Sequence, residues 1–362
     1  MRFDHAARRV AVRASLAEHG VPLPLIVTDL ANVRWLSGFS GSNAVLVLGG
    51  TPADDLLGTD GRYRDQAAAE SPDLPLLIDR DTLVSVLGRL TAQGAEGPIA
   101  VEAGLSMAEL AHVQRLFGEP VIAPPVVEAA RAIKEADEQA LLERACGITA
   151  AAFEDLAAGI RVGDTEVGLA RRLESLFADH GAHDRAFATI VGTGPHSAIP
   201  HHQPLPVALA EGDLLVIDAG ALVDGYHADM TRTFVVGREA ELWQRDLHAG
   251  VLAAQQAAVA ACLVGAEFVG VDALARAHLR EAGLEEHFTH GLGHGVGLRI
   301  HEAPGLGARA TGTIRANMAF TVEPGAYLPG RGGVRIEDTL VVTDAGPRVL
   351  TEAPRGLRVV GV

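Results

Sequence analysis

The chain has little of what marks secreted or membrane-bound proteins. Only two of its 362 residues are cysteines, Cys146 and Cys262. Each lies in an alanine-rich helical pattern, which favours a buried free thiol over a disulfide or a redox pair. The amino-terminal residues are charged throughout and lack the apolar core of a signal peptide, and no hydrophobic run is long enough to span a bilayer. We therefore expect a cytoplasmic protein.

Basic residues are scarce as well. The chain has 30 lysines and arginines against 46 aspartates and glutamates, which gives a net charge of −16. This surplus of negative charge argues against nucleic acid and against an anionic membrane as partners. Bound cations would neutralise part of it.

Length and pattern predict two domains. A chain of 362 residues is long enough for two or three domains of about 150 residues each. Residues 1–128 alternate short strands with amphipathic helical stretches, which is typical of an α/β domain. The segment 124–140 then brings a proline pair and an acidic helix start, so we place the linker there. Residues 129–362 form the second domain.

The second domain repeats one order of elements, two helices followed by strands. The predicted helices run from about Glu135, over roughly 165–180, from about 240 to 264 and from 272 to 282. Thr165 is a suitable cap for the second helix, and Gly181 and Gly283 are suitable stops. The repeated order predicts an α+β domain with two halves around a pseudo-two-fold axis, although the halves share no sequence repeat.

Five candidate metal ligands follow one another in this domain. Four are carboxylates and one is an imidazole: Asp218, Asp229, His294, Glu323 and Glu337. All lie beside apolar or β-branched residues, where an uncompensated charge would be costly. Pairing with arginines is the alternative, but the acids outnumber the nearby bases. Bound cations are the simpler explanation, and an oxygen-rich site with one imidazole favours a hard divalent ion. We expect Mn²⁺, with Co²⁺ or Zn²⁺ as substitutes.

The spacing of the aspartates supports a shared site. Residues 214–237 read as two β-rich runs around a turn at Asp224 and Gly225. That turn pairs Asp218 with Thr231 and makes Asp218 and Asp229 diagonal neighbours, roughly 7–8 Å apart on one sheet face.

The other three candidates lie in strand-like or glycine-rich sequence. Glu323 and Glu337 belong to two strand-like runs joined by a predicted loop over 326–333. Glycines surround His294 too closely for a helix, which favours close approach of the backbone to a ligand, with tight packing as the alternative.

These positions and their flanking sequences, among them GHGVGL, IHEAP and RIEDT, resemble the pita-bread metallopeptidases. Within that group the chain resembles the proline-specific Xaa-Pro aminopeptidases and Xaa-Pro dipeptidases (prolidases). NVRWLSGFSGSNAVLVL and TDGRYRDQA resemble their amino-terminal domain. The resemblance implies a smaller creatinase-like α/β domain over 1–128, a pita-bread catalytic domain over 129–362, and a homodimer. The implied activity is exopeptidase cleavage of the Xaa-Pro bond in dipeptides or short peptides.

The resemblance also implies ligand roles. Asp229 and Glu337 would bridge two ions, with Asp218 on one ion and His294 and Glu323 on the other. A bridging water would be acidified to the attacking hydroxide. Glu323, beside that water, would move the proton.

Four further residues are candidates for the substrate side. By resemblance His201, His290 and His301 line the substrate cleft, with His201 and His301 near the scissile carbonyl or the departing proline and His290 near the second ion. A structural histidine is the alternative for each. Arg335 lies on the strand face of Glu337 and would orient a ligand or a substrate carboxylate. The sequence leaves dipeptidase, aminopeptidase and carboxypeptidase-like preferences open.

Other functions on the same fold are disfavoured. A creatinase-type amidinohydrolase and a metal-free peptide- or protein-binding module are associated with loss of the ligands, and all five are present here. Methionine aminopeptidases share the ligands but generally lack the amino-terminal domain. Tyr226, His227 and His202 are interpreted as ordinary turn or surface residues, and His248, His278 and His287 as helix-associated.

Overall fold

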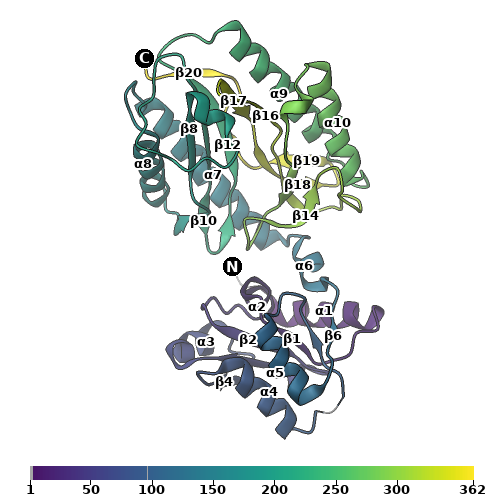
Figure 1. The fold of residues 1–362 in the computed structure, drawn as a ribbon. Coiled ribbons are helices and arrows are strands. Elements are labelled where there is room, and N and C mark those ends of the chain that lie inside the picture. The colour runs from purple at the N-terminus through teal and green to yellow at the C-terminus, as the bar shows by residue number, and fades with distance from the viewer. Residues whose placement is uncertain (1–2, 96) are drawn as a thin grey trace. The chain divides into compact units, whose positions relative to one another are not determined.

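The computed structural model describes residues 3–95 and 97–362. The chain divides into two units, Met1–Arg131 and Ala132–Val362 (Figure 1). The boundary falls within the segment predicted as the linker, part of which forms the short helix α6, Val126–Arg131. In the described part of the chain, no helix is both long and apolar enough to cross a bilayer.

The first unit is built on one mixed sheet of six strands in the order β4-β3-β2-β1-β5-β6. The strands are β1 Leu25–Val27, β2 Ala44–Leu48, β3 Leu56–Thr59, β4 Leu76–Ile78, β5 Ala100–Val101 and β6 Val121–Ile122. The other helices are α1 His5–Glu18, α2 Leu30–Ser37, α3 Arg64–Glu70, α4 Thr82–Ala92 and α5 Met107–Phe117. The predicted alternation of strands and helices is confirmed.

Caps and apolar burial explain these elements. Asp29 accepts hydrogen bonds from the backbone at the start of α2, and Ser106 forms a capping box with Glu109 at the start of α5. All five residues of β2 are buried. One face of the sheet packs against α4 and α5, and this contact forms the core of the unit.

The first half of the second unit begins with α7 Ala136–Gly159 and α8 Glu166–Asp179. Its strands are β7 Asp184–Arg185, β8 Ile190–Thr193, β9 Leu214–Ala219, β10 Ala221–Val223, β11 Tyr226–His227 and β12 Met230–Val236. Thr165 caps α8 and Gly181 follows it with φ 89°, as predicted. Cys146 is buried in α7 and is a free thiol, as expected.

The second half repeats the order with α9 Leu242–Ala261 and α10 Phe268–Glu281. Its strands are β13 Gly293–Gly295, β14 Glu302–Leu306, β15 Ala319–Val322, β16 Gly325–Leu328, β17 Gly332–Arg335, β18 Asp338–Thr343, β19 Gly346–Val349 and β20 Arg358–Val360. The predicted loop over 326–333 is wrong, because β16 and β17 form an antiparallel hairpin there. The helix predicted from 272 begins earlier, at Phe268, after the N-cap Glu267.

Three sheets place the second unit's candidate residues near one another. The strand orders are β20-β12-β9-β8, β14-β13-β15-β18-β19 and β16-β17. Strand β20 pairs in parallel with β12, so the end of the second half completes the sheet of the first. Figure 1 shows the strands between α8 on one side and α9 and α10 on the other. The main core of the unit lies where α9 and α10 pack against β15 and β18.

Candidate metal centre

Two of the candidate carboxylates come from one hairpin. Asp224 and Gly225 have φ values of 47° and 79°, the left-handed conformations that a two-residue hairpin turn requires. Asp218 on β9 pairs with Thr231 on β12, as predicted from this turn. Asp229 directly precedes β12. The dipeptide at the turn therefore fixes how the two aspartates are aligned.

The two glutamates lie where strands break. Glu323 follows β15 and precedes Pro324, and its backbone N–H donates to Leu292 O at 2.8 Å. Glu337 lies between β17 and β18, and its N–H donates to Thr231 O at 3.2 Å. This last bond ties a strand of the second half to β12 of the first half. Both glutamates are thus fixed by backbone contacts.

His294 lies on β13, which is extended, as predicted from its glycines. Close approach of this backbone to a ligand stays a prediction, but the glycines also have a packing role. A side chain at Gly293 would meet Thr321 O at 2.0 Å, and one at Gly295 would meet Ala303 O at 2.2 Å. The glycines therefore allow neighbouring backbones to pack around His294, which was the alternative interpretation.

The five predicted ligands gather in one cluster. Ligand atoms of Asp229, His294 and Glu337 all lie within 4.8 Å of one another. Nε2 of His294 is 3.4 Å from Oδ2 of Asp229 and 3.5 Å from Oε1 of Glu323. Asp218 is close enough that its charge raises the pKa of Asp229. Residues from both halves of the unit therefore meet at one point.

The cluster holds more negative charge than the protein neutralises. Burial raises the pKa of Asp229 and of Glu337 well above the usual range, and the neighbouring carboxylates raise each further. Burial also raises the pKa of Glu323 to about 7. Such shifts arise when carboxylates are desolvated and crowded without a compensating charge.

Divalent cations fit this donor set. Oδ1 of Asp218 is buried and has no hydrogen-bond partner among the described residues, although a buried oxygen is normally satisfied. Arginine pairing does not account for the cluster. Arg335 pairs with Asp218 at 2.7 Å and Arg232 with Asp338 at 2.8 Å, which leaves Asp229 without an arginine partner in the described structure.

Arg335 connects several parts of the centre. Its guanidinium donates to Oδ2 of Asp218 at 2.7 Å, to Oγ1 of Thr231 at 3.0 Å, to the hydroxyl of Tyr327 at 2.9 Å and to Pro200 O at 3.2 Å. Of its two predicted roles, this geometry supports the orientation of a ligand carboxylate. Its charge offsets part of the carboxylate repulsion.

The three candidate substrate histidines surround the cluster. Nε2 of His290 lies 2.8 Å from the hydroxyl of Tyr327, and its Nδ1 lies 3.9 Å from Oε2 of Glu323. Burial lowers the pKa of His290 to about 4, so its ring is neutral at pH 7. His301 is exposed and stands edge-on to His294, with ring centroids 4.4 Å apart.

Neighbouring contacts fix the segments that carry the exposed histidines. Partial burial of its ring lowers the pKa of His301, and the charges of His294 and His201 lower it further, which places His201 on the same side. Glu302, the residue after His301, is held by Nζ of Lys134 at 2.8 Å. Both exposed imidazoles remain accessible beside the cluster.

Sequence comparison identifies the family. Residues 140–344 match metallopeptidase family M24, and residues 8–133 match the creatinase/prolidase N-terminal domain. The chain belongs to metallopeptidase family M24. It is 36% identical to the Xaa-Pro dipeptidase of Pyrococcus furiosus over 337 residues, which cover 92% of this chain and 94% of that protein.

Solved structures of the family are also similar. The Xaa-Pro dipeptidase from Bacillus anthracis matches with a TM-score of 0.93 and 32% identity, over 99% of this chain and 100% of that one. The X-Pro aminopeptidase from Thermotoga maritima matches with a TM-score of 0.89 and 32% identity, over 97% and 99% of the two chains. The predicted pita-bread catalytic domain and creatinase-like amino-terminal domain are confirmed, and the chain is a metallopeptidase.

Two polar residues of this M24 centre were missed in the sequence. Tyr327 lies in the stretch predicted as a loop, and its hydroxyl joins Arg335 to His290. Burial raises the pKa of Tyr327 to about 12, so its hydroxyl keeps its proton. Thr231, fully buried, donates to Oε2 of Glu337 at 2.7 Å. The sequence could have indicated Thr231, because the predicted hairpin already placed it opposite Asp218.

Three residues interpreted as turn or surface residues make specific hydrogen-bond contacts in the structure. Tyr226 is buried and donates to Oε1 of Glu138 at 2.8 Å, and Nδ1 of His227 lies 2.9 Å from Gly297 O. His202 is buried against Glu166. These contacts are structural, but the interpretation of Tyr226 and His202 as surface residues is wrong.

Proposed function

We propose that this M24 metallopeptidase hydrolyses the Xaa-Pro bond of dipeptides or short peptides at a centre for two divalent ions. The observation that carries the proposal is the convergence of four carboxylates and one histidine in one cluster, in which Oδ1 of Asp218 has no hydrogen-bond partner among the described residues. The names of the similar proteins, Xaa-Pro dipeptidase and X-Pro aminopeptidase, support the substrate class.

The proposed ligands are the five clustered residues. Asp229 and Glu337 would each contact both ions, Asp218 one ion, and His294 and Glu323 the other. Mn²⁺ is the first choice for these oxygen-rich donors, with Co²⁺ or Zn²⁺ as substitutes. When bound, the ions supply Lewis acidity toward the scissile carbonyl and acidify a shared water to hydroxide at neutral pH.

The chain's own groups move protons and hold the peptide. Glu323, a proposed ligand beside the shared water, would accept that water's proton and pass it to the departing proline nitrogen. His201 and His301, exposed beside the cluster, would donate to the scissile carbonyl or contact the proline. His290 is neutral and hydrogen-bonded to Tyr327, and it would contact the peptide near the second ion.

The Xaa-Pro bond is a tertiary amide, and it has less preference for the trans form than other peptide bonds. A site that distinguishes this bond needs rigidly placed groups on both sides of it. Arg335 helps to hold such groups in place, because it donates hydrogen bonds to Pro200 O and to Asp218. The preferred length of the peptide substrate would be determined by residues other than these. We include the homodimer implied by the family resemblance in the proposal.

The test is product analysis with the full-length enzyme loaded with Mn²⁺. Xaa-Pro, Xaa-Pro-Xaa and longer peptides are incubated in parallel, with the corresponding Xaa-Ala peptides as controls, and the products are separated by length. We expect release of the first residue from proline-containing peptides and little cleavage of the alanine series. Asp229→Ala should abolish the reaction while its circular dichroism spectrum is unchanged.

Two results would contradict the proposal. The first is near-normal turnover by Asp229→Ala or Glu337→Ala. The second is elemental analysis of a fully active preparation that shows no transition metal. Equal cleavage of the alanine and proline peptides would retain the metallopeptidase but remove the proline specificity.

A further inference from the structure

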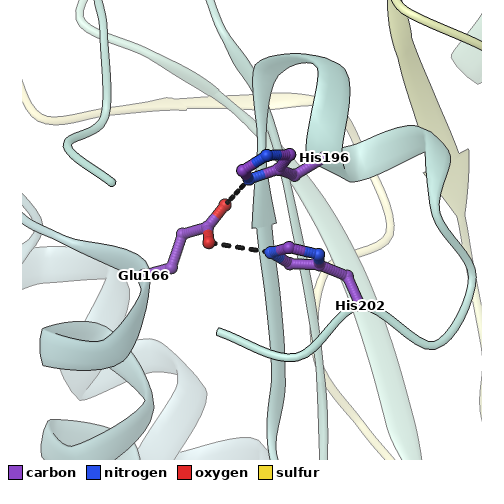
Figure 2. A group of neighbouring side chains, drawn as sticks. All are labelled: Glu166, His196 and His202. Carbon is purple, nitrogen blue, oxygen red and sulfur yellow. Dashed lines mark hydrogen bonds and ion pairs between the residues drawn. The ribbon is translucent and has the colours of Figure 1, made fainter. Parts of the chain in front are cut away.

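A second polar cluster lies outside the metal centre, around the first residue of α8. Figure 2 shows His196 and His202 pointing at the two oxygens of the buried Glu166 carboxylate. Oε1 accepts from Thr193 N and from Nδ1 of His196, both at 2.9 Å. Oε2 accepts from Nε2 of His202 at 2.8 Å and from Leu205 N at 2.9 Å. We call these four contacts the Glu166 latch.

The latch is a hydrogen-bond assembly rather than a cation site. Two of its donors are backbone N–H groups, which only donate, so the carboxylate must accept. Burial opposes ionisation of Glu166, but the four hydrogen bonds outweigh it and lower the pKa of Glu166 below its usual value. Each imidazole donates one proton to a carboxylate oxygen. A metal ion between them would displace both protons.

The latch holds both ends of a segment whose middle reaches the metal centre. Its donors bracket residues 193–205. Between them, Pro200 O accepts from Arg335 at 3.2 Å, and Oγ of Ser197 accepts from Gly333 N at 2.9 Å. His201 therefore lies between Pro200, held by Arg335, and His202, held by Glu166.

We propose that Glu166 is a positioning residue that sets where His201 stands in the substrate site. The inference rests on the role given to His201 in the proposed function. Glu166 does not touch the metal ligands, and its four bonds immobilise the chain on both sides of His201. Displacement of a catalytic group by about 1 Å can cost about 100-fold in rate, so this anchoring has a measurable effect.

The test is a double-mutant cycle with Glu166→Gln and His201→Ala in the Mn²⁺-loaded enzyme, assayed on an Xaa-Pro dipeptide. Glutamine is nearly the same size as glutamate but presents an amide NH₂ to two of the four donors. We expect Glu166→Gln to lower kcat/KM by about 10- to 100-fold, mainly through kcat. In the His201→Ala background the same change should cost less than about twofold, because the group it positions is gone.

Glu174→Gln is the matched control. Glu174 is also on α8, and it pairs at the surface with Arg185. The control should change kcat/KM by less than about twofold. Thermal melting and metal content of each variant show whether any loss comes from unfolding or demetallation. Equal losses from Glu166→Gln in both backgrounds would overturn the proposal, since Glu166 would then act independently of His201.

A second readout separates this proposal from the proposed function. In NMR spectra of histidine-labelled, metal-free protein, Glu166→Gln should shift the imidazole signals of His201, whereas Glu174→Gln should leave them in place. This readout applies even if the wild-type enzyme cleaves no Xaa-Pro peptide, a result that refutes the proposed function alone. Unshifted His201 signals, or loss of the His196 and His202 N–H signals on titration with Zn²⁺, would overturn the latch.

Discussion

Replacing Thr231 by valine should weaken metal binding without removing a ligand. The fully buried Thr231 hydroxyl donates to Oε2 of Glu337 at 2.7 Å and accepts from Nε of Arg335 at 3.0 Å. Valine has nearly the same shape and can do neither. Glu337 would then lose the contact that fixes its carboxylate, and Nε of Arg335 would lose its acceptor.

The expected loss of metal affinity follows from these two contacts. Loss of a group that orients a metal ligand typically costs 10- to 100-fold in metal affinity, which is about 1.4 to 2.8 kcal/mol. Thr233→Val is the matched control on the same strand. The Thr233 hydroxyl donates to Arg335 O at 2.9 Å and accepts from Arg335 N at 3.2 Å, and it touches no carboxylate. Both variants should lose stability by about 1 to 3 kcal/mol.

Calorimetric titration of the metal-free variants with Mn²⁺ measures the affinity, and urea unfolding measures the stability. We expect a higher dissociation constant in Thr231→Val, a near-normal one in Thr233→Val and recovery in Thr231→Ser. If both valine variants bind Mn²⁺ equally well, Thr231 does not orient Glu337 and the reasoning fails.

Three other outcomes are expected. His301→Ala should lower turnover more than metal content, and a matched loss of bound metal would place His301 among the ligands. Burial raises the pKa of Cys146 far above its usual value and that of Cys262 to about 12, so neither thiol should react with a disulfide reagent at pH 8 until urea unfolds the chain. Burial lowers the pKa of His248, whose Nε2 donates to Arg355 O at 2.9 Å. As pH falls, the unfolded chain therefore takes up a proton at His248 before the folded chain does, and the free energy of unfolding should fall below about pH 6.5. His248→Gln should lose less of this free energy over the same pH range. If urea unfolding gives the same dependence of stability on pH for the variant and the wild type, the effect is excluded.

Local signals in the sequence were enough to predict the hairpin of the centre. Asp224 and Gly225 adopt positive φ at low cost, and this turn fixes the pairing of Asp218 with Thr231. The cap Thr165 and the stop Gly181 of α8 are similarly local. Each depends on the chemistry of a few consecutive residues.

Features that depend on distant parts of the chain were not predicted. The hairpin of β16 and β17 was hidden by its glycines and proline, and with it the bond between Tyr327 and Arg335. Glu166 follows the cap Thr165, where an acidic residue is ordinarily explained by the helix dipole. Its partners lie about 30 to 40 residues further along the chain, and no local pattern connects them.

The parallel pairing of β20 with β12 has a consequence for biosynthesis. During translation β12 leaves the ribosome long before Arg358–Val360, so one of its edges stays without its neighbour while the second half is being made. An exposed strand edge invites pairing with other chains. Nascent chains stalled before β20 should consequently self-associate or recruit chaperones, whereas released chains should not.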